Sequence, residues 1–267
     1  MARYVHGYTP REAQRLHDQA ASVRELLHGD TRYAPGELVL EPGCGVGAQT
    51  VTLAAGSPAA RFLALDLVPE SVMAARKLMG AEGLTNVDFA VADLYNLPCA
   101  DARFDHIFLC YVLEHLPHPE GALAALRRVL RPGGTITAIE GDHGSCYFHP
   151  DTPAARAAWR CLIDVQAKLG GDSLIGRRLY PLLAGAGFRE VRVSPRMIYA
   201  DAGRLELRHD FVAQTITPMV EGVRAQALAA GMIDEQTWER GIAELYAIPQ
   251  SDEGTFCYTF FKAVAVK

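Results

Sequence analysis

The stretch that decides the fold is LVLEPGCGVGAQT, from Leu38 to Thr50. An apolar run ends here in Glu41-Pro42, and glycines then stand at positions 43, 45 and 47. Such a run followed by a glycine-rich turn is typical of a buried strand that leads into a helix. Because glycine lacks a Cβ, this turn lets the backbone come close to a ligand. The stretch therefore predicts a strand, a ligand-binding loop and a helix, in that order.

The chain after this loop alternates short apolar runs with amphipathic segments. Strands are predicted at 37–41, 61–67, 87–93, 104–112 and 133–141. Helices are predicted at 47–56, 69–83 and 119–130. Strands that alternate with helices of this length form a parallel sheet covered by helices. The sequence therefore predicts a doubly wound α/β fold.

Composition excludes several classes of partner. The formal net charge is −5 and no Lys/Arg-rich block is present, which argues against nucleic acid. No apolar run is long enough to cross a membrane, and the start MARYVHGYTPREAQRL has no apolar signal region, so we expect a cytoplasmic protein. The six cysteines are scattered without a C-x-x-C pair. They are expected to be free thiols, and no metal site is expected.

Three acidic residues narrow the choice of ligand. Gly43-x-Gly45-x-x-Ala48 fits the dinucleotide fingerprint, and Asp66 at the end of the second strand could accept ribose hydroxyls in either kind of site. Asp93 ends the third strand, where its carboxylate could hold an adenine amino group. Glu41 would repel a pyrophosphate but suits a ligand with positive charge. These residues favour a nucleoside ligand that carries a cation instead of phosphates.

The motifs together resemble those of one enzyme family. They are Glu41-x-Gly43-x-Gly45-x-Gly47, Asp66, Ala92-Asp93, LPCADARFDHI, VLEHL and LRPGGT. In this order they are similar to the class I S-adenosylmethionine-dependent methyltransferases, from about Leu38 to Glu140. The resemblance implies a seven-stranded, mostly parallel Rossmann-like sheet and S-adenosyl-L-methionine as the cofactor. It also implies the cofactor-binding residues Glu41, Gly43, Cys44, Gly45, Asp66, Leu67, Asp93, Leu94 and Cys110.

We expect the chain to be a single methyltransferase domain without a flexible linker or an internal repeat. Its predicted parts are an N-terminal helical cap over 1–36, a cofactor-binding core over 37–150, helices over 151–187, a strand over 188–199, a helical lid over 200–250 and a final strand over 255–267. The cap begins with Thr9-Pro10-Arg11-Glu12, which is typical of a capping box. We expect the cap and the lid to close over the acceptor, because the core alone would leave the methyl donor open to water.

Polar residues follow the fourth and fifth predicted strands in two groups. The first group, after the fourth strand, is Glu114-His115. The second group lies in EGDHGSCYFHP, which is expected to be a loop, and loops at this edge of a sheet carry function. His115 of the first group is expected to be structural. The candidate catalytic residues are Glu114, Glu140, Asp142, His143 and Tyr8. The sequence leaves open which carboxylate acts.

The flanks YVHGYTPRE, IEGDHGSCYFHP, PMVEGV and GTFCYTFFK resemble a narrower bacterial group. That group includes indole C3-methyltransferases of physostigmine and pyrroloindoline biosynthesis. The resemblance implies an aromatic small-molecule substrate and leaves a homodimer open. The alternatives are O- or N-methylation of another small metabolite, an NAD-dependent oxidoreductase, and a protein that binds S-adenosylmethionine without catalysis.

Overall fold

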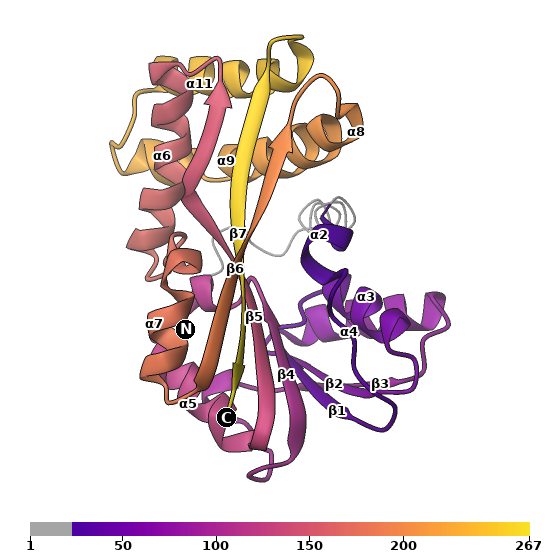
Figure 1. Cartoon of the computed structure of the whole chain (residues 1–267). Helices are drawn as coiled ribbons and strands as arrows, with labels where there is room; N and C mark the ends of the chain where they lie inside the picture. The colour runs from indigo at the N-terminus through magenta and orange to yellow at the C-terminus, as the bar shows by residue number, and fades with distance from the viewer. Residues whose placement is uncertain (1–22) are drawn as a thin grey trace. The chain divides into compact units, whose positions relative to one another are not determined.

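The computed structural model describes residues 23–267 (Figure 1). Most of the predicted N-terminal cap, including its capping box, lies outside the described residues. The chain divides into two compact units, each built from segments that are separate in the sequence. We call residues 24–140, 175–195 and 261–267 the core unit, and residues 23, 141–174 and 196–260 the helical unit.

One sheet contains all seven strands in the order β3-β2-β1-β4-β5-β7-β6. They are β1 (Leu38–Pro42), β2 (Arg61–Asp66), β3 (Val87–Val91), β4 (Phe104–Cys110), β5 (Leu130–His149), β6 (Arg189–Ala200) and β7 (Thr255–Val266). The pairs β1–β2, β2–β3, β1–β4 and β4–β5 are parallel. Strand β1 lies between β2 and β4. After β3, the chain crosses back over the sheet and forms β4 on the other side of β1. This is the predicted doubly wound arrangement, which is confirmed.

The helices of the core unit connect these strands. They are α2 (Arg24–His28), α3 (Ala48–Gly56), α4 (Pro69–Ala81), α5 (Pro119–Val129) and α7 (Leu179–Gly185), with short 3₁₀ turns η1 (Leu94–Asn96), η2 (Leu113–His115) and η3 (Ile175–Arg178). Helices α4 and α5 each begin with proline in the first turn, where the missing N–H costs nothing. In Figure 1, α3 lies beside α4, with which it packs.

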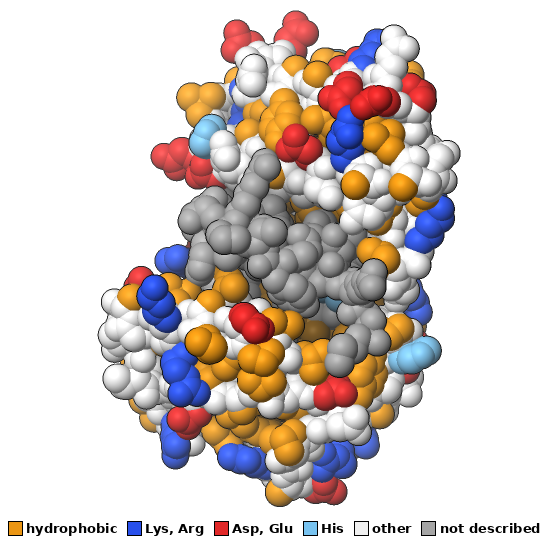
Figure 2. Space-filling view, turned by 180° about the vertical axis from the view of Figure 1, so that it is seen from behind, with side chains coloured by type: hydrophobic (Ala, Val, Ile, Leu, Met, Phe, Trp, Pro, Cys, Tyr) orange, Lys and Arg blue, Asp and Glu red, His pale blue; other side chains and the backbone are white. Residues whose placement is uncertain are grey.

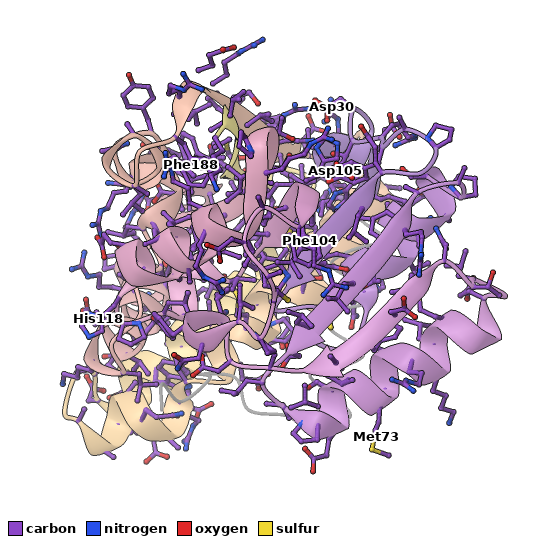
Figure 3. The ribbon with its side chains drawn as sticks, turned by 90° about the horizontal axis from the view of Figure 1, so that it is seen from below. Asp30, Met73, Phe104, Asp105, His118 and Phe188 are labelled. Atoms are coloured by element: carbon purple, nitrogen blue, oxygen red, sulfur yellow. The ribbon has the colours of Figure 1, made fainter. Side chains whose placement is uncertain are left out.

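The first two residues of β4 contribute a buried aromatic side chain and a carboxylate that contacts neighbouring segments. Phe104 is fully buried, whereas the next side chain, Asp105, accepts a hydrogen bond from the Leu38 N–H at 2.6 Å. Asp105 also pairs with Arg131 at 2.7 Å. Figure 3 shows Phe104 inside this layer, while Met73 points outward from α4. The beginnings of the neighbouring strands β1 and β4 are therefore joined by the Asp105 side chain as well as by the backbone pairing of the strands.

The helical unit contains α6 (Pro153–Lys168), α8 (Leu205–Leu207), the π-helix η4 (Arg208–Ile216), α9 (Thr217–Glu221), α10 (Arg224–Ala229), α11 (Glu235–Ala247) and the 3₁₀ turn η5 (Ile248–Gln250). These elements from α8 to η5 cover most of residues 205–250. Helix α6 lies along α11 (Figure 1), and Gly241 sits so close to the Ala154 carbonyl that a Cβ would not fit. Buried Arg208 donates to the carbonyls of Pro249 and Ser251, at 2.6 Å each, and so ties η4 to η5 and the residue after it.

The segment EGDHGSCYFHP is not a loop, and this prediction is wrong. Strand β5 continues to His149 and passes from the core unit into the helical unit after Glu140. Cys146 and Phe148 are buried and Tyr147 between them is exposed, which is the alternation of a strand. The Ser145 hydroxyl accepts a hydrogen bond from the Thr259 N–H of β7 at 3.2 Å. Pairing with β7 therefore extends the strand through glycines that sequence rules assign to a turn.

The charges of the described surface are mixed. On the face shown in Figure 2, acidic and basic side chains are interspersed over each unit. No helix within residues 23–267 combines the length and the apolar character that a membrane crossing requires.

Candidate functional site

The candidate cofactor residues lie at one edge of the core unit. Glu41 is near the end of β1, Asp66 ends β2, Asp93 follows β3 and Cys110 ends β4. Because these strands are parallel, their carboxyl ends meet at the same edge. The structure therefore brings together the cofactor residues that the sequence predicts.

The glycines of the loop after β1 have different roles. Gly43 has φ +75° and a Cβ on it would lie 2.6 Å from a methyl group of Val112, so this glycine serves close packing within the protein. Gly45 has φ +52°, and a Cβ there would meet no atom of residues 23–267 within 4 Å. The Gly43 and Cys44 N–H groups donate to the Leu65 carbonyl at 2.7 and 2.9 Å. The loop is thus held against β2, while no other part of the described chain packs against Gly45.

Asp66 connects the glycine loop to the end of β2. One carboxylate oxygen accepts the Gly45 N–H and the other accepts the Val68 N–H, each at 2.9 Å. A carboxylate can accept about four hydrogen bonds, so about two remain for a ligand. Asp66 is placed to hold a pair of ligand hydroxyls without giving up its hold on the loop.

Glu41 is a buried carboxyl group beneath the loop. It is 3% exposed, and burial raises its pKa to about 8. Its Oε2 atom makes no hydrogen bond to any of residues 23–267. A buried polar atom without a partner is costly, and a cationic or hydrogen-bond-donating ligand would relieve that cost. This is the strongest local sign that something binds at the loop.

The remaining cofactor candidates form the walls of the same edge. Asp93 begins the turn η1 and accepts the Tyr95 N–H at 2.9 Å, and Leu94 is partly buried in the core. Leu67 is half exposed. Burial raises the pKa of both the Cys44 and the Cys110 thiols, so neither is a ready nucleophile.

The loop after β4 is held by Glu140. Its Oε1 accepts the N–H groups of Val112 at 3.0 Å and Leu113 at 2.8 Å, and its Oε2 lies 3.4 Å from the Glu114 N–H. The side chain is fully buried, and burial together with the neighbouring Glu114 carboxylate raises its pKa well above the ordinary value. The acceptor atoms of Glu140 are thus directed to the protein backbone.

Glu114 is the second carboxyl group of this loop. It lies in η2, is 8% exposed, and its Oε1 is 3.6 Å from the Nε2 of His115. The preceding Tyr111 has φ +57°, a conformation that costs about 1–2 kcal/mol for a side chain with a Cβ. The loop is therefore bent sharply where the candidate carboxylate is presented.

Asp142 and His143 belong to the helical unit and are both buried. Asp142 accepts the Gly144 N–H at 2.9 Å. His143 Nδ1 is 2.5 Å from the hydroxyl of Tyr258, and its carbonyl accepts the indole N–H of Trp159 at 2.8 Å. Tyr8, the remaining candidate, lies outside the described residues.

Sequence reasoning missed Tyr258 and the backbone of Val112 and Leu113. A signal for Tyr258 was present in GTFCYTFFK, where every second residue of β7 from Phe256 to Lys262 is buried. A tyrosine and a lysine on the buried side of a strand need partners. No sequence signal marks the backbone groups, because their role depends on a carboxylate from another strand.

Comparison with known proteins matches residues 40–138 to a family described as a methyltransferase domain. The chain is 30% identical over 198 residues to an O-methyltransferase of Pyrenophora dematioidea, covering 71% of this chain and 69% of that one. It is 36% identical over 188 residues to an uncharacterized 37.1 kDa protein in transposon TN4556 of Streptomyces fradiae. This match covers 69% of the chain but 53% of the transposon protein, so the chain spans about half of that relative's length.

Solved structures share the fold. Phosphoethanolamine N-methyltransferase 2 of Haemonchus contortus, in complex with phosphomonomethylethanolamine and S-adenosylhomocysteine, aligns with a TM-score of 0.58. The alignment covers 94% of this chain and 52% of that one, at 14% identity. Such a likeness establishes the architecture, and the chemistry has to be argued from the site.

Proposed function

Because this chain belongs to the methyltransferase family, we propose that it transfers a methyl group from S-adenosyl-L-methionine to a small organic acceptor. The family uses this cofactor, and the family match covers the glycine loop, Asp66 and Asp93. The single observation that carries the proposal is the buried Oε2 of Glu41, which has no hydrogen-bond partner among residues 23–267, next to a loop where none of these residues packs against Gly45.

The residues of this edge fit the cofactor's groups. S-Adenosylmethionine carries an ammonium and a sulfonium, one ribose and no phosphate. Glu41 would oppose the positive charge, Asp66 would accept the ribose hydroxyls, and Asp93 with Leu94 would hold the adenine. The absence of a Cβ at Gly45 would let the methionine part approach the backbone. This donor set suits a cation better than the pyrophosphate of NAD, which disfavours the oxidoreductase alternative.

When bound, the cofactor supplies an electrophilic methyl group on a positively charged sulfur. The protein's part is to align the acceptor, exclude water and manage the acceptor's proton. We propose that Glu114 manages the acceptor's proton within the core unit. The carboxylate oxygens of Glu140 already accept hydrogen bonds from backbone N–H groups. Asp142 and His143, with Tyr258 hydrogen-bonded to the imidazole, are the corresponding groups in the helical unit.

For the acceptor we propose the C3 atom of an indole. An indole that gains a methyl group at C3 develops positive charge at its ring nitrogen. A carboxylate in a dry environment stabilises that charge far better than water does, and it can accept the N–H proton. The low exposure of Glu114 supports this role. The cytoplasmic location and closure by residues 1–30 and 200–250 stay predictions, and a homodimer stays open.

Methylation of oxygen is the second candidate. It is favoured by the relative from Pyrenophora dematioidea, which is named an O-methyltransferase. A phenol or alcohol acceptor would also need a base, so the same carboxylates would serve. The two candidates differ in the atom that receives the methyl group.

The experiment that tests the proposal is mass spectrometry of isotopically labelled methyl transfer to a panel of indoles, phenols and amines. The label is expected on C3 of an indole, and label found on oxygen or nitrogen alone would replace this acceptor with the second candidate or with an amine. Cofactor binding in calorimetry without transfer to any acceptor would favour a non-catalytic binding protein. Failure to bind S-adenosylmethionine would overturn the function as a whole.

Variants identify the acting carboxylate. Glu114→Gln should lower kcat by about 10²–10⁴ with little change in cofactor affinity, as expected when a general base is removed. The matched control is Glu82→Gln, which alters an exposed glutamate at the end of α4. If Glu114→Gln and Asp142→Asn both keep nearly full turnover, neither carboxylate has the proposed role.

A further inference from the structure

The loop after β4 is confined on two sides by different parts of the core unit. On one side, Val112 fills the space that a side chain at position 43 would need. On the other side, Glu140 accepts N–H groups from successive residues of the loop. These contacts span 28 residues for Val112 and 27 for Leu113, so the loop's own sequence does not set its position.

The loop would not hold this shape by itself. Tyr111 has φ +57°, which a tyrosine adopts only when its surroundings require it. The N–H groups of Val112 and Leu113 lie in a buried turn, where they need an acceptor. The next residue is Glu114, the carboxylate proposed to act on the acceptor. Its position therefore depends on whatever satisfies these two N–H groups.

We propose that Glu140 is a positioning residue, which clamps the loop after β4 through the Val112 and Leu113 N–H groups and so sets the place of Glu114. This inference rests on the proposed function for its effect on turnover, but the clamp itself is independent of activity. A general base would take up a proton. Glu140 acts instead as a hydrogen-bond acceptor, because its side chain is long enough for one oxygen to reach both N–H groups. A proton on its carboxyl group is not needed for the clamp.

Two substitutions separate the clamp from a base. Glu140→Gln keeps the length and an amide oxygen that can accept both N–H groups, but it cannot take a proton. Glu140→Asp keeps a titratable carboxyl group but is one methylene shorter, so it cannot reach both N–H groups without moving the loop. A clamp predicts that Gln is better tolerated than Asp, and a base predicts the reverse.

The first measurement is hydrogen–deuterium exchange of the peptide that contains Val112 and Leu113, without cofactor or acceptor. Glu140→Gln should keep the slow exchange of the wild-type protein. Glu140→Asp and Glu140→Ala should exchange faster in this peptide, while a peptide from α11 serves as the internal control. Equal protection in all variants would overturn the clamp, whatever the protein's activity.

The second measurement is turnover. Glu140→Asp and Glu140→Ala should lose about 10² in kcat, the cost of misplacing a reacting group by about 1 Å, and Glu140→Gln should recover most of this loss. A loss of about 10²–10⁴ in Glu140→Gln with Glu140→Asp closer to wild type would assign proton transfer to Glu140 and overturn the inference. If the wild-type protein transfers no methyl group, the proposed function fails, and the exchange measurement still decides the clamp.

Discussion

The glycine loop allows a prediction in which stability and ligand binding separate. Gly43→Ala and Gly45→Ala make the same chemical change two residues apart, and both positions have positive φ. A Cβ at position 43 would collide with Val112 at 2.6 Å, whereas a Cβ at position 45 would meet none of the atoms that the structure describes within 4 Å. We expect the first variant to lose mainly stability and the second to lose mainly affinity for S-adenosylmethionine.

The magnitudes follow from two costs. Alanine at positive φ costs about 1–2 kcal/mol, and forcing an extra methyl group into packed space costs about 1–3 kcal/mol more. Gly45→Ala should therefore lose about 1–2 kcal/mol and Gly43→Ala about 2–5 kcal/mol. At about 2–4 °C per kcal/mol, the melting temperature should fall by roughly 2–8 °C and roughly 4–20 °C, respectively.

The assays are thermal unfolding without ligand and calorimetric titration with S-adenosylmethionine. Gly83→Ala is the control, because Gly83 also has positive φ with open space around its Cβ position but lies at the end of α4. It should match Gly45→Ala in stability and the wild type in affinity, while Gly45→Ala should lose about tenfold or more in affinity. The reasoning fails if Gly45→Ala melts as low as Gly43→Ala, or if Gly43→Ala loses more affinity than Gly45→Ala.

Three further predictions concern charged side chains. Asp66→Ala should weaken S-adenosylmethionine binding by about 1.5–3 kcal/mol, the value of charge-assisted hydrogen bonds, and calorimetry showing unchanged affinity would remove its assigned role. Lys262 donates to the Leu27 carbonyl and the Thr31 hydroxyl at 2.9 and 2.6 Å and pairs with the Asp30 carboxylate at 2.6 Å. Lys262→Met should therefore cost about 1–3 kcal/mol for each buried acceptor left unpaired in urea unfolding, while exposed Lys168→Met should cost little. Because burial raises the pKa of Glu41 to about 8 from 4.5, the folded protein binds more protons than the unfolded chain between these values, and its stability should fall as pH rises through this window. Glu41→Gln should flatten that fall in a series of melting curves, and an identical slope in both proteins would contradict the assignment.

The sequence predicted the part of the fold in which short apolar runs alternate with amphipathic segments. The strands and helices from Leu38 to Glu140 repeat a simple alternation, and the carboxyl ends of parallel strands must share an edge. The places of Asp66 and Asp93 followed from that rule, whereas the resemblance to the methyltransferases implied the rest of the cofactor residues. The loop at EGDHGSCYFHP was wrong, because pairing with β7 depends on residues from Thr255 onward. Long-range pairing overrides the turn preference of glycine, and a single sequence does not reveal it.

Some residues of the candidate site could be predicted from the sequence, and others could not. Glu41 and Asp66 were predictable because each stands at a strand end next to a glycine loop. The clamp at Glu140 was not, because its partners are backbone N–H groups that any residue could supply. For the same reason, residue type alone could not separate the carboxylates of Glu114 and Glu140.

Strand β7 has a consequence for how the chain is made. It contributes Thr255–Phe260 to the helical unit and Phe261–Val266 to the core unit, with buried side chains in both. A ribosome that has finished residues 38–140 has therefore released a core unit that still lacks its Lys262 anchor and the buried Ala263 and Ala265. Neither unit completes its hydrophobic core before this one strand emerges, so both should fold only once β7 has emerged and not one after the other before it. A nascent chain stalled before Thr255 should be digested throughout by protease, with no protected fragment from either unit.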